Sequence, residues 1–87
     1  MGKYKLVFKK SVAKDLRALP SKDVARILSR IRALANEPRP EGCEKLSGED
    51  RYRVRQGVYR IVYEIKDDVL TVTVVKIGHR QDIYRTR

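Results

Sequence analysis

The sequence predicts an α+β fold in which a strand and a helical hairpin precede a three-stranded antiparallel meander, with the helices packed on one face of the sheet. Three observations lead to this prediction. Apolar residues alternate near the start of the chain, recur at helical spacing through residues 12–35, and alternate again in three later segments rich in β-branched and aromatic residues. We expect the 87 residues to form a single domain over 1–87.

The first element is a short strand, because apolar and other residues alternate over residues 3–8. A helix is expected next, over about residues 11–19. Its three apolar positions recur at four- and three-residue spacing, and they are Val12, Leu16 and Leu19. Pro20 ends this helix.

The second helix has the strongest pattern in the chain. Ser21 is expected as its N-cap, and the apolar stripe that follows has i, i+3, i+4, i+7 spacing. The stripe contains Val24, Ile27, Leu28, Ile31, Leu34 and Ala35. Asn36 suits a left-handed C′ position and Pro38 stops the helix. Residues 38–50 then read as a long surface loop, and loops of this length are often functional.

Three strands are predicted after this loop, over residues 52–55, 58–65 and 69–76. Gln56-Gly57 and Asp67-Asp68 are expected to form the turns between them. The tail, residues 77–87, is expected to be a short final strand or an ordered coil.

The predicted meander separates two kinds of side chain. With Gln56-Gly57 as a two-residue loop, Arg53 lies opposite Arg60, and Arg55 shares their face. The other face is apolar and belongs under the helices; it carries Tyr52, Val54, Tyr59 and Ile61. Like charges directly opposite on a sheet are destabilising, so the arginines are either a solvated polar face or a phosphate-binding site. By the same alternation Glu64 is the only acid expected on the arginine side.

Composition limits the function. Twenty-one Lys and Arg against 11 Asp and Glu give a net charge of +10, which favours an anionic partner, either nucleic acid or an acidic protein. One Cys and one His cannot form a disulfide framework or a usual zinc site. No apolar run approaches the ~20 residues of a membrane-spanning helix, so we expect a cytoplasmic protein.

Several segments together resemble the RelE/ParE superfamily of toxins from prokaryotic toxin–antitoxin systems, and the RelE branch most. They are residues 45–48 (KLSG), 52–65 (YRVRQGVYRIVYEI), 75–80 (VKIGHR) and Tyr84. The likeness covers nearly the whole chain, including the order of its elements. It implies a ribosome-dependent mRNA endonuclease that cuts the codon in the ribosomal A site and is held inactive by a cognate antitoxin, expected to be acidic.

The resemblance also implies which residues act. The catalytic positions fall at Arg53, Arg55, Arg60, Arg80 and Tyr84. Lys45 matches a basic loop position that contacts RNA, and His79 is a second RNA-binding candidate. His79 has an ordinary pKa near ~6.5 and could serve as an acid or base, although a lone histidine is more often structural. The corresponding alternative for Tyr84 is a packed C-terminal anchor.

One departure from the family bears on the chemistry. RelE commonly has lysines where this chain has Arg53 and Arg55, and arginine stays protonated in proteins. These residues can therefore stabilise charge on a phosphate but are poor general bases, and the base is not identified. No acidic pair or metal cluster is visible, so the expected reaction is attack by the 2′-hydroxyl without a metal or other cofactor.

Two other functions fit the same sequence. A ParE-like toxin would inhibit DNA gyrase by binding alone, on the same scaffold. A generic nucleic-acid-binding module is the third candidate, and it is weaker because the arginine side offers few exposed aromatic residues for stacking.

Overall fold

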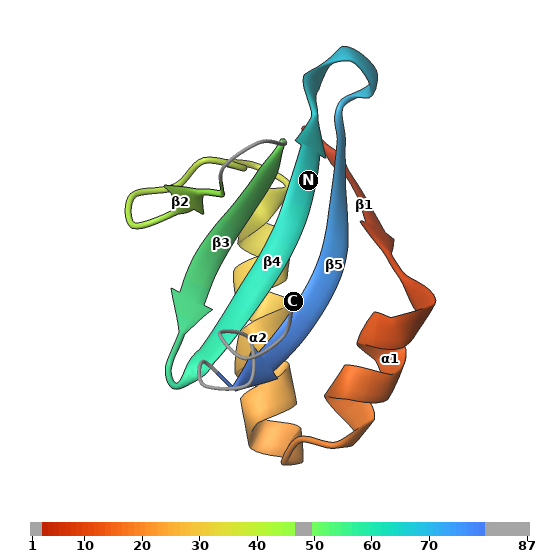
Figure 1. The fold of residues 1–87 in the computed structure, drawn as a ribbon, viewed down its shortest axis with the longest axis vertical. Helices are drawn as coiled ribbons and strands as arrows, with labels where there is room; N and C mark the ends of the chain where they lie inside the picture. Colours follow the sequence, from red (N-terminus) through yellow and green to blue (C-terminus); the bar gives the residue numbers. More distant parts are fainter. Residues whose placement is uncertain (1–2, 47–49, 80–87) are drawn as a thin grey trace.

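The computed structural model describes residues 3–46 and 50–79, and it confirms the α+β class (Figure 1). Two helices, α1 (Lys10–Arg17) and α2 (Ser21–Leu34), pack against one sheet. The strands are β1 (Lys5–Phe8), β2 (Glu44–Lys45), β3 (Arg51–Gln56), β4 (Tyr59–Lys66) and β5 (Thr71–His79). Figure 1 shows α2 crossing behind β3, β4 and β5, while α1 lies beside β5.

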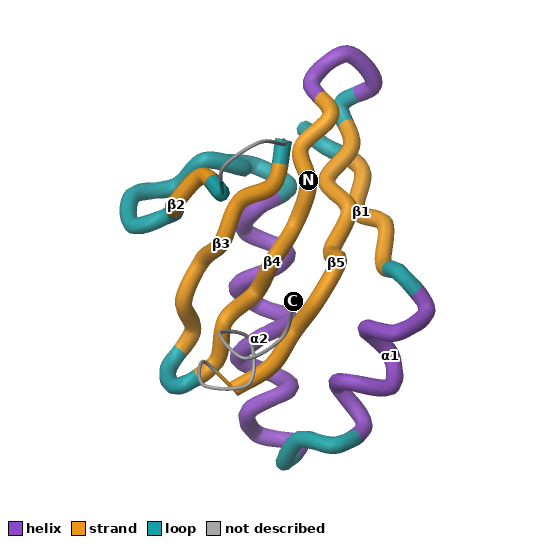
Figure 2. Tube along the Cα trace, viewed as in Figure 1, coloured by secondary structure: helices purple, strands orange, loops and turns teal. Residues whose placement is uncertain are grey.

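The sheet has the strand order β1-β5-β4-β3-β2 (Figure 2). The three-stranded meander is present as β3, β4 and β5, all antiparallel. Two strands extend it. β1 pairs with β5 in parallel, with the helical hairpin between them in sequence. The two-residue β2 lies within the segment that was expected to be only a loop, and it pairs with β3.

The register expected for the β3–β4 hairpin was wrong by two residues. The turn consists of Gly57 and Val58, so Gln56 pairs with Tyr59 and Arg55 lies opposite Arg60. Gly57 has φ +62°, a conformation that glycine adopts without a steric penalty. A two-residue shift leaves every side chain on its predicted face, because the side-chain period of a strand is two.

The β4–β5 turn also differs from the prediction, because it is longer than the two residues Asp67-Asp68. It occupies four residues, with a 3₁₀ turn at Asp67–Val69 and Leu70 at φ 46°, so Ile65 lies opposite Val72. The register then shifts between Val62 and Tyr63. This irregularity turns Ile77 into the core, where it is 2% exposed. Consequently β5 continues to His79, past the position where a separate tail was expected to begin.

The helix ends also differ in detail from the predictions. Pro20 occupies the N-cap of α2 and Ser21 is its first residue, with no side-chain cap. Asn36 is not left-handed, since Leu70 is the only non-glycine residue with positive φ in the described chain. Neither helix has the length and apolar character needed to cross a membrane.

The core lies between the helices and one face of the sheet. Its side chains come from both helices and from the three central strands. Fully or nearly fully buried are Val12, Ile27, Ile31, Leu34, Tyr52, Val54, Ile61, Tyr63, Ile65, Val72, Val74 and Ile77. This layer fixes β3 and β4, which carry the candidate site on their other face.

Candidate functional site

The three arginines singled out in the sequence lie on the sheet face that points away from the helices, as the alternation predicted, and a fourth, Arg51, lies beside them and bonds to Glu64. We call Arg53, Arg55 and Arg60 the arginine face. Arg53 and Arg55 come from β3 and Arg60 from the central strand β4. Arg55 and Arg60 are directly opposite each other in the register, and the Cβ atoms of such a cross-strand pair are about 5 Å apart.

The exposure of the three arginines is unequal. Arg55 is exposed, whereas Arg60 is only 6% exposed. Arg60 was expected to face solvent, and that expectation was wrong. It lies on a strand with neighbours on both sides, between Arg55 and Gly78. Electrostatic interactions are stronger in such a desolvated position, so Arg60 acts on nearby charges more strongly than an exposed arginine does.

Glu44 adds an acid to the arginine face that the sequence did not predict. β2 places it opposite Arg53, and its Oε1 accepts hydrogen bonds from Arg53 Nε at 3.1 Å and Nη2 at 2.5 Å. Arg53 holds the pKa of Glu44 below its usual value, and Arg60 and Arg55 act in the same direction. Glu64 was expected to be the only acid on this side, and it binds Arg51 at 2.9 Å.

The remaining predicted site residues lie apart from the arginine face or outside the described chain. Lys45 is in register with Tyr52, which assigns it to the opposite side of β2 from Glu44. His79 pairs with Tyr59, and their rings make an edge contact with centroids 6.2 Å apart. The pairing puts His79 on the side of Tyr59 rather than of Arg60. Arg80 and Tyr84 lie outside the described residues.

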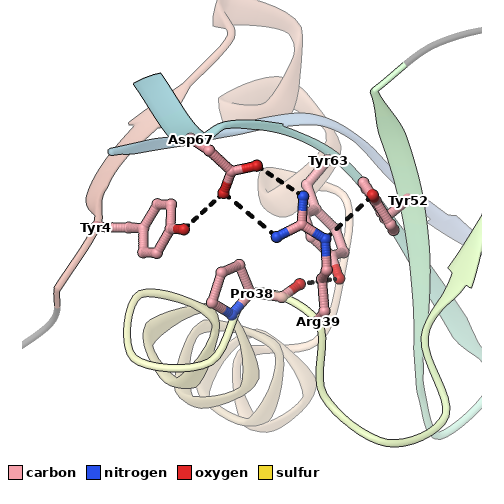
Figure 3. Close-up of polar contacts among 6 residues, drawn as sticks. All are labelled: Tyr4, Pro38, Arg39, Tyr52, Tyr63 and Asp67. Atoms are coloured by element: carbon pink, nitrogen blue, oxygen red, sulfur yellow. Dashed lines mark hydrogen bonds and ion pairs between the residues drawn. The ribbon is translucent and has the colours of Figure 1, made fainter. Parts of the chain in front are cut away.

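A hydrogen-bonded network fixes the start of β3 from the helical side (Figure 3). Arg39 donates from Nε to the Tyr52 hydroxyl at 3.1 Å and from Nη2 to Asp67 Oδ2 at 2.9 Å. Tyr4 donates to Asp67 Oδ1 at 2.7 Å. The hydrogen bond from Arg39 and, to a smaller extent, that from Tyr4 lower the pKa of the Asp67 carboxyl. The network thereby connects the N-terminal segment, the loop after α2 and the β4–β5 turn to the residue that precedes Arg53.

Tyr63 makes a second polar anchor inside the core. Its hydroxyl donates to the carbonyl of Pro38 at 2.7 Å, and its ring stacks on Tyr52 with centroids 6.0 Å apart. Burial raises the pKa of Tyr63. Because Tyr52 precedes Arg53 and pairs with Tyr63, the arginine face adjoins a part of the sheet that is packed and hydrogen-bonded.

The arrangement provides positive charge on a rigid support. Guanidinium groups present planar donors that match phosphate oxygens, and donors fixed before the reaction stabilise developing negative charge most effectively. Arginine does not give up its proton at neutral pH. The arginine face can therefore bind and neutralise a phosphate, while proton transfer requires another group.

The comparisons with known proteins define the class. The family model of the ParE toxin of type II toxin–antitoxin systems matches residues 6–84, and the chain belongs to this family of toxins. It is 33% identical over 86 residues to Toxin RelG of Mycobacterium tuberculosis, covering 94% of this chain and 97% of the relative. The Putative toxin RelE1 of Methanocaldococcus jannaschii is 31% identical over 87 residues, covering 95% and 97%.

The fold agrees with this assignment. The toxin in the crystal structure of the archaeal RelE–RelB complex from Pyrococcus horikoshii OT3 superposes with a TM-score of 0.81 at 31% identity, covering 88% of this chain and 94% of that one. The resemblance to RelE-type toxins in the sequence is thereby confirmed, and so is the fold that it implied.

Proposed function

We propose that this toxin is a ribosome-dependent mRNA endonuclease that cleaves mRNA in the ribosomal A site. The observation that carries the proposal is the placement of Arg55 directly opposite Arg60 on a rigid hairpin, with Arg53 on the same face. A pure binding toxin has no need to hold like charges together against their repulsion. The RelE-type names of the relatives support the same branch of the superfamily.

In this proposal the three arginines act on the scissile phosphate. They bind it and stabilise the extra negative charge that builds up as the 2′-hydroxyl attacks. No metal or other cofactor is assigned a role. Arg80 is proposed to hold the phosphate or to protonate the departing 5′ oxygen, and Tyr84 to stack on a base. Lys45 and His79 are proposed as RNA contacts outside the arginine face.

The ribosome supplies what this site lacks. A site without a strong general base depends on accurate positioning of the reacting groups. mRNA held in the A site presents its phosphate and 2′-hydroxyl in a fixed geometry, whereas free RNA does not. We therefore expect cleavage on ribosomes and weak cleavage of free RNA.

A cognate antitoxin is the second proposed partner. The solved relatives include RelE toxins in complex with RelB, and a toxin of net charge +10 fits an acidic antitoxin. We propose that such an antitoxin binds this toxin and keeps it inactive. Co-purification with the neighbouring gene product tests this proposal, and recovery of the toxin alone, harmless to its host, contradicts it.

Mapping of mRNA ends tests the enzymatic proposal. A translation reaction with the purified protein should yield new mRNA ends within A-site codons, and these ends should be missing without the protein. The alternative function, inhibition of DNA gyrase, is measured in parallel by DNA supercoiling. Loss of supercoiling with intact mRNA would replace the nuclease by the gyrase inhibitor.

A further inference from the structure

The ion pair between Glu44 and Arg53 lies within the proposed phosphate-binding surface. Both side chains point to the arginine face, because Glu44 and Arg53 are opposite each other in the β2–β3 register. The Glu44 side chain is 63% exposed and that of Arg53 19%. One carboxylate oxygen accepts from two nitrogens of the same guanidinium group, Nε and Nη2.

This carboxylate is an anion built into an anion-binding surface. It occupies Nε and Nη2 of Arg53, two donors that a phosphate oxygen also accepts from. Taken with Arg53, Arg55 and Arg60 alone, it also lowers the charge of the group from that of three guanidinium groups to a net of two. All three arginines favour the ionised form of Glu44, so the carboxylate carries its charge at neutral pH.

We propose that Glu44 is a specificity-determining residue that competes with RNA phosphates for Arg53 and thereby weakens the binding of free RNA. The inference rests on the proposed function, since it requires that the arginine face binds RNA. It adds a residue that favours mRNA held in the ribosomal A site over free RNA.

The energetics of the pair explain how such selection works. The carboxylate side of the pair is exposed to water, and ion pairs that water reaches contribute little to stability, so a phosphate can displace the carboxylate. A phosphate already fixed in the ribosomal A site does so without further ordering. A free strand must also lose conformational freedom when it binds, and the remaining attraction of the arginine face is then reduced by Glu44. Glu44 weakens both kinds of binding by the same factor, and free RNA, which binds more weakly at the outset, is the form that this factor leaves unbound.

The test is the salt dependence of RNA binding by the full-length protein. The probe is a short single-stranded RNA with 2′-O-methyl groups, which cannot be cleaved by 2′-hydroxyl attack, and its affinity is measured by fluorescence anisotropy over a series of KCl concentrations. Glu44→Gln should bind about two- to fivefold more tightly than wild type, the range that corresponds to an exposed pair. The slope of log affinity against log salt should steepen by about 0.7, the value for one additional phosphate contact on a single strand.

Glu37→Gln is the matched control. It removes the same charge from an exposed residue that follows α2, on the other side of the sheet. Its affinity and slope should equal those of wild type. An equal gain in both variants would show a general effect of net charge and would overturn the inference.

Arg55→Ala separates this inference from the proposed function. If Arg55→Ala weakens RNA binding while Glu44→Gln leaves affinity and slope unchanged, only the role of Glu44 is wrong. If Glu44→Gln binds more weakly, Glu44 positions Arg53 instead of competing for it, and the inference is also overturned. If Arg55→Ala has no effect on binding, the arginine face is not an RNA surface, and both the inference and the proposed function fail.

Discussion

The two faces of the β3–β4 hairpin differ in chemistry although they are formed by alternate residues of the same two strands. On the helical face, Tyr52, Val54 and Ile61 are at most 8% exposed and pack under the helices. On the other face, Arg53 and Arg55 alternate with them. Successive residues of the strand therefore alternate between side chains that pack in the core and side chains that lie on the opposite face. We therefore expect a substitution on the helical face to lower stability and a substitution at the next residue, on the arginine face, to lower activity.

The faces also differ in how their polar groups are paired. On the helical side, Tyr63 bonds to the carbonyl of Pro38 and Arg39 to Asp67, so these polar groups are paired within the protein. The arginine face contains like charges opposite each other on β3 and β4, and an exposed carboxylate beside them on β2. Internally paired polar groups, as on the helical side, are typical of a region that stabilises the fold. Like charges held together, as on the arginine face, are typical of a binding surface.

Ile61→Ala should give the largest loss of stability. Ile61 is fully buried, so its truncation leaves a cavity under the helices and should lower the free energy of unfolding by about 2–5 kcal/mol. Urea denaturation measures this. Val58→Ala, at the exposed turn of the same hairpin, should change stability by less than about 0.5 kcal/mol. Equal losses in the two variants would contradict the assignment of the core to this face.

Tyr63→Phe should give an intermediate loss. The variant keeps the ring but leaves the buried carbonyl of Pro38 without the hydroxyl that now donates to it. The expected cost is about 1–3 kcal/mol in the free energy of unfolding. Tyr59→Phe is the comparison, because its hydroxyl bonds to Asp23 in a half-buried position where water can replace it. A larger loss in Tyr59→Phe would show that the polar anchor lies elsewhere.

Asp67→Asn should give the smallest effect, visible mainly in its pH dependence. The pKa of Asp67 lies below its ordinary value of 3.8 in the folded protein, so its ion pair stabilises the fold above that pH and is lost as the pH falls through the folded pKa. Wild type should therefore be more stable than Asp67→Asn at neutral pH, and the difference should shrink in acid. Thermal melts across this range measure it, and a difference that grows in acid would contradict the network.

The faces of the hairpin could be predicted from the sequence because they depend only on alternation. The register could not, since alternation does not say whether Gly57 is the first or the second residue of the turn. Both choices keep Arg53 and Arg55 on one face and Tyr52 and Val54 on the other. The partner of Arg60 changed as a result from Arg53 to Arg55.

Other features have no local signal. The parallel pairing of β1 with β5 joins segments more than sixty residues apart, and nothing within either segment specifies it. Glu44 belongs to a two-residue strand, which is too short to show a period. The burial of Arg60 follows from the position of β4 at the centre of the sheet, which depends on the pairing of all its neighbours.

The most direct test of the account is the rate of mRNA cleavage by Arg55→Ala on purified ribosomes, measured in single turnover beside its urea denaturation curve. Arg55 is exposed and faces away from the core. The account predicts an unchanged denaturation midpoint and a rate about 100- to 1000-fold lower, as for the loss of one charge-stabilising donor. Lys66→Ala, an exposed cation at the other end of β4, should cleave like wild type. Cleavage by Arg55→Ala at the wild-type rate would contradict the claim that the arginine face is the site of the reaction.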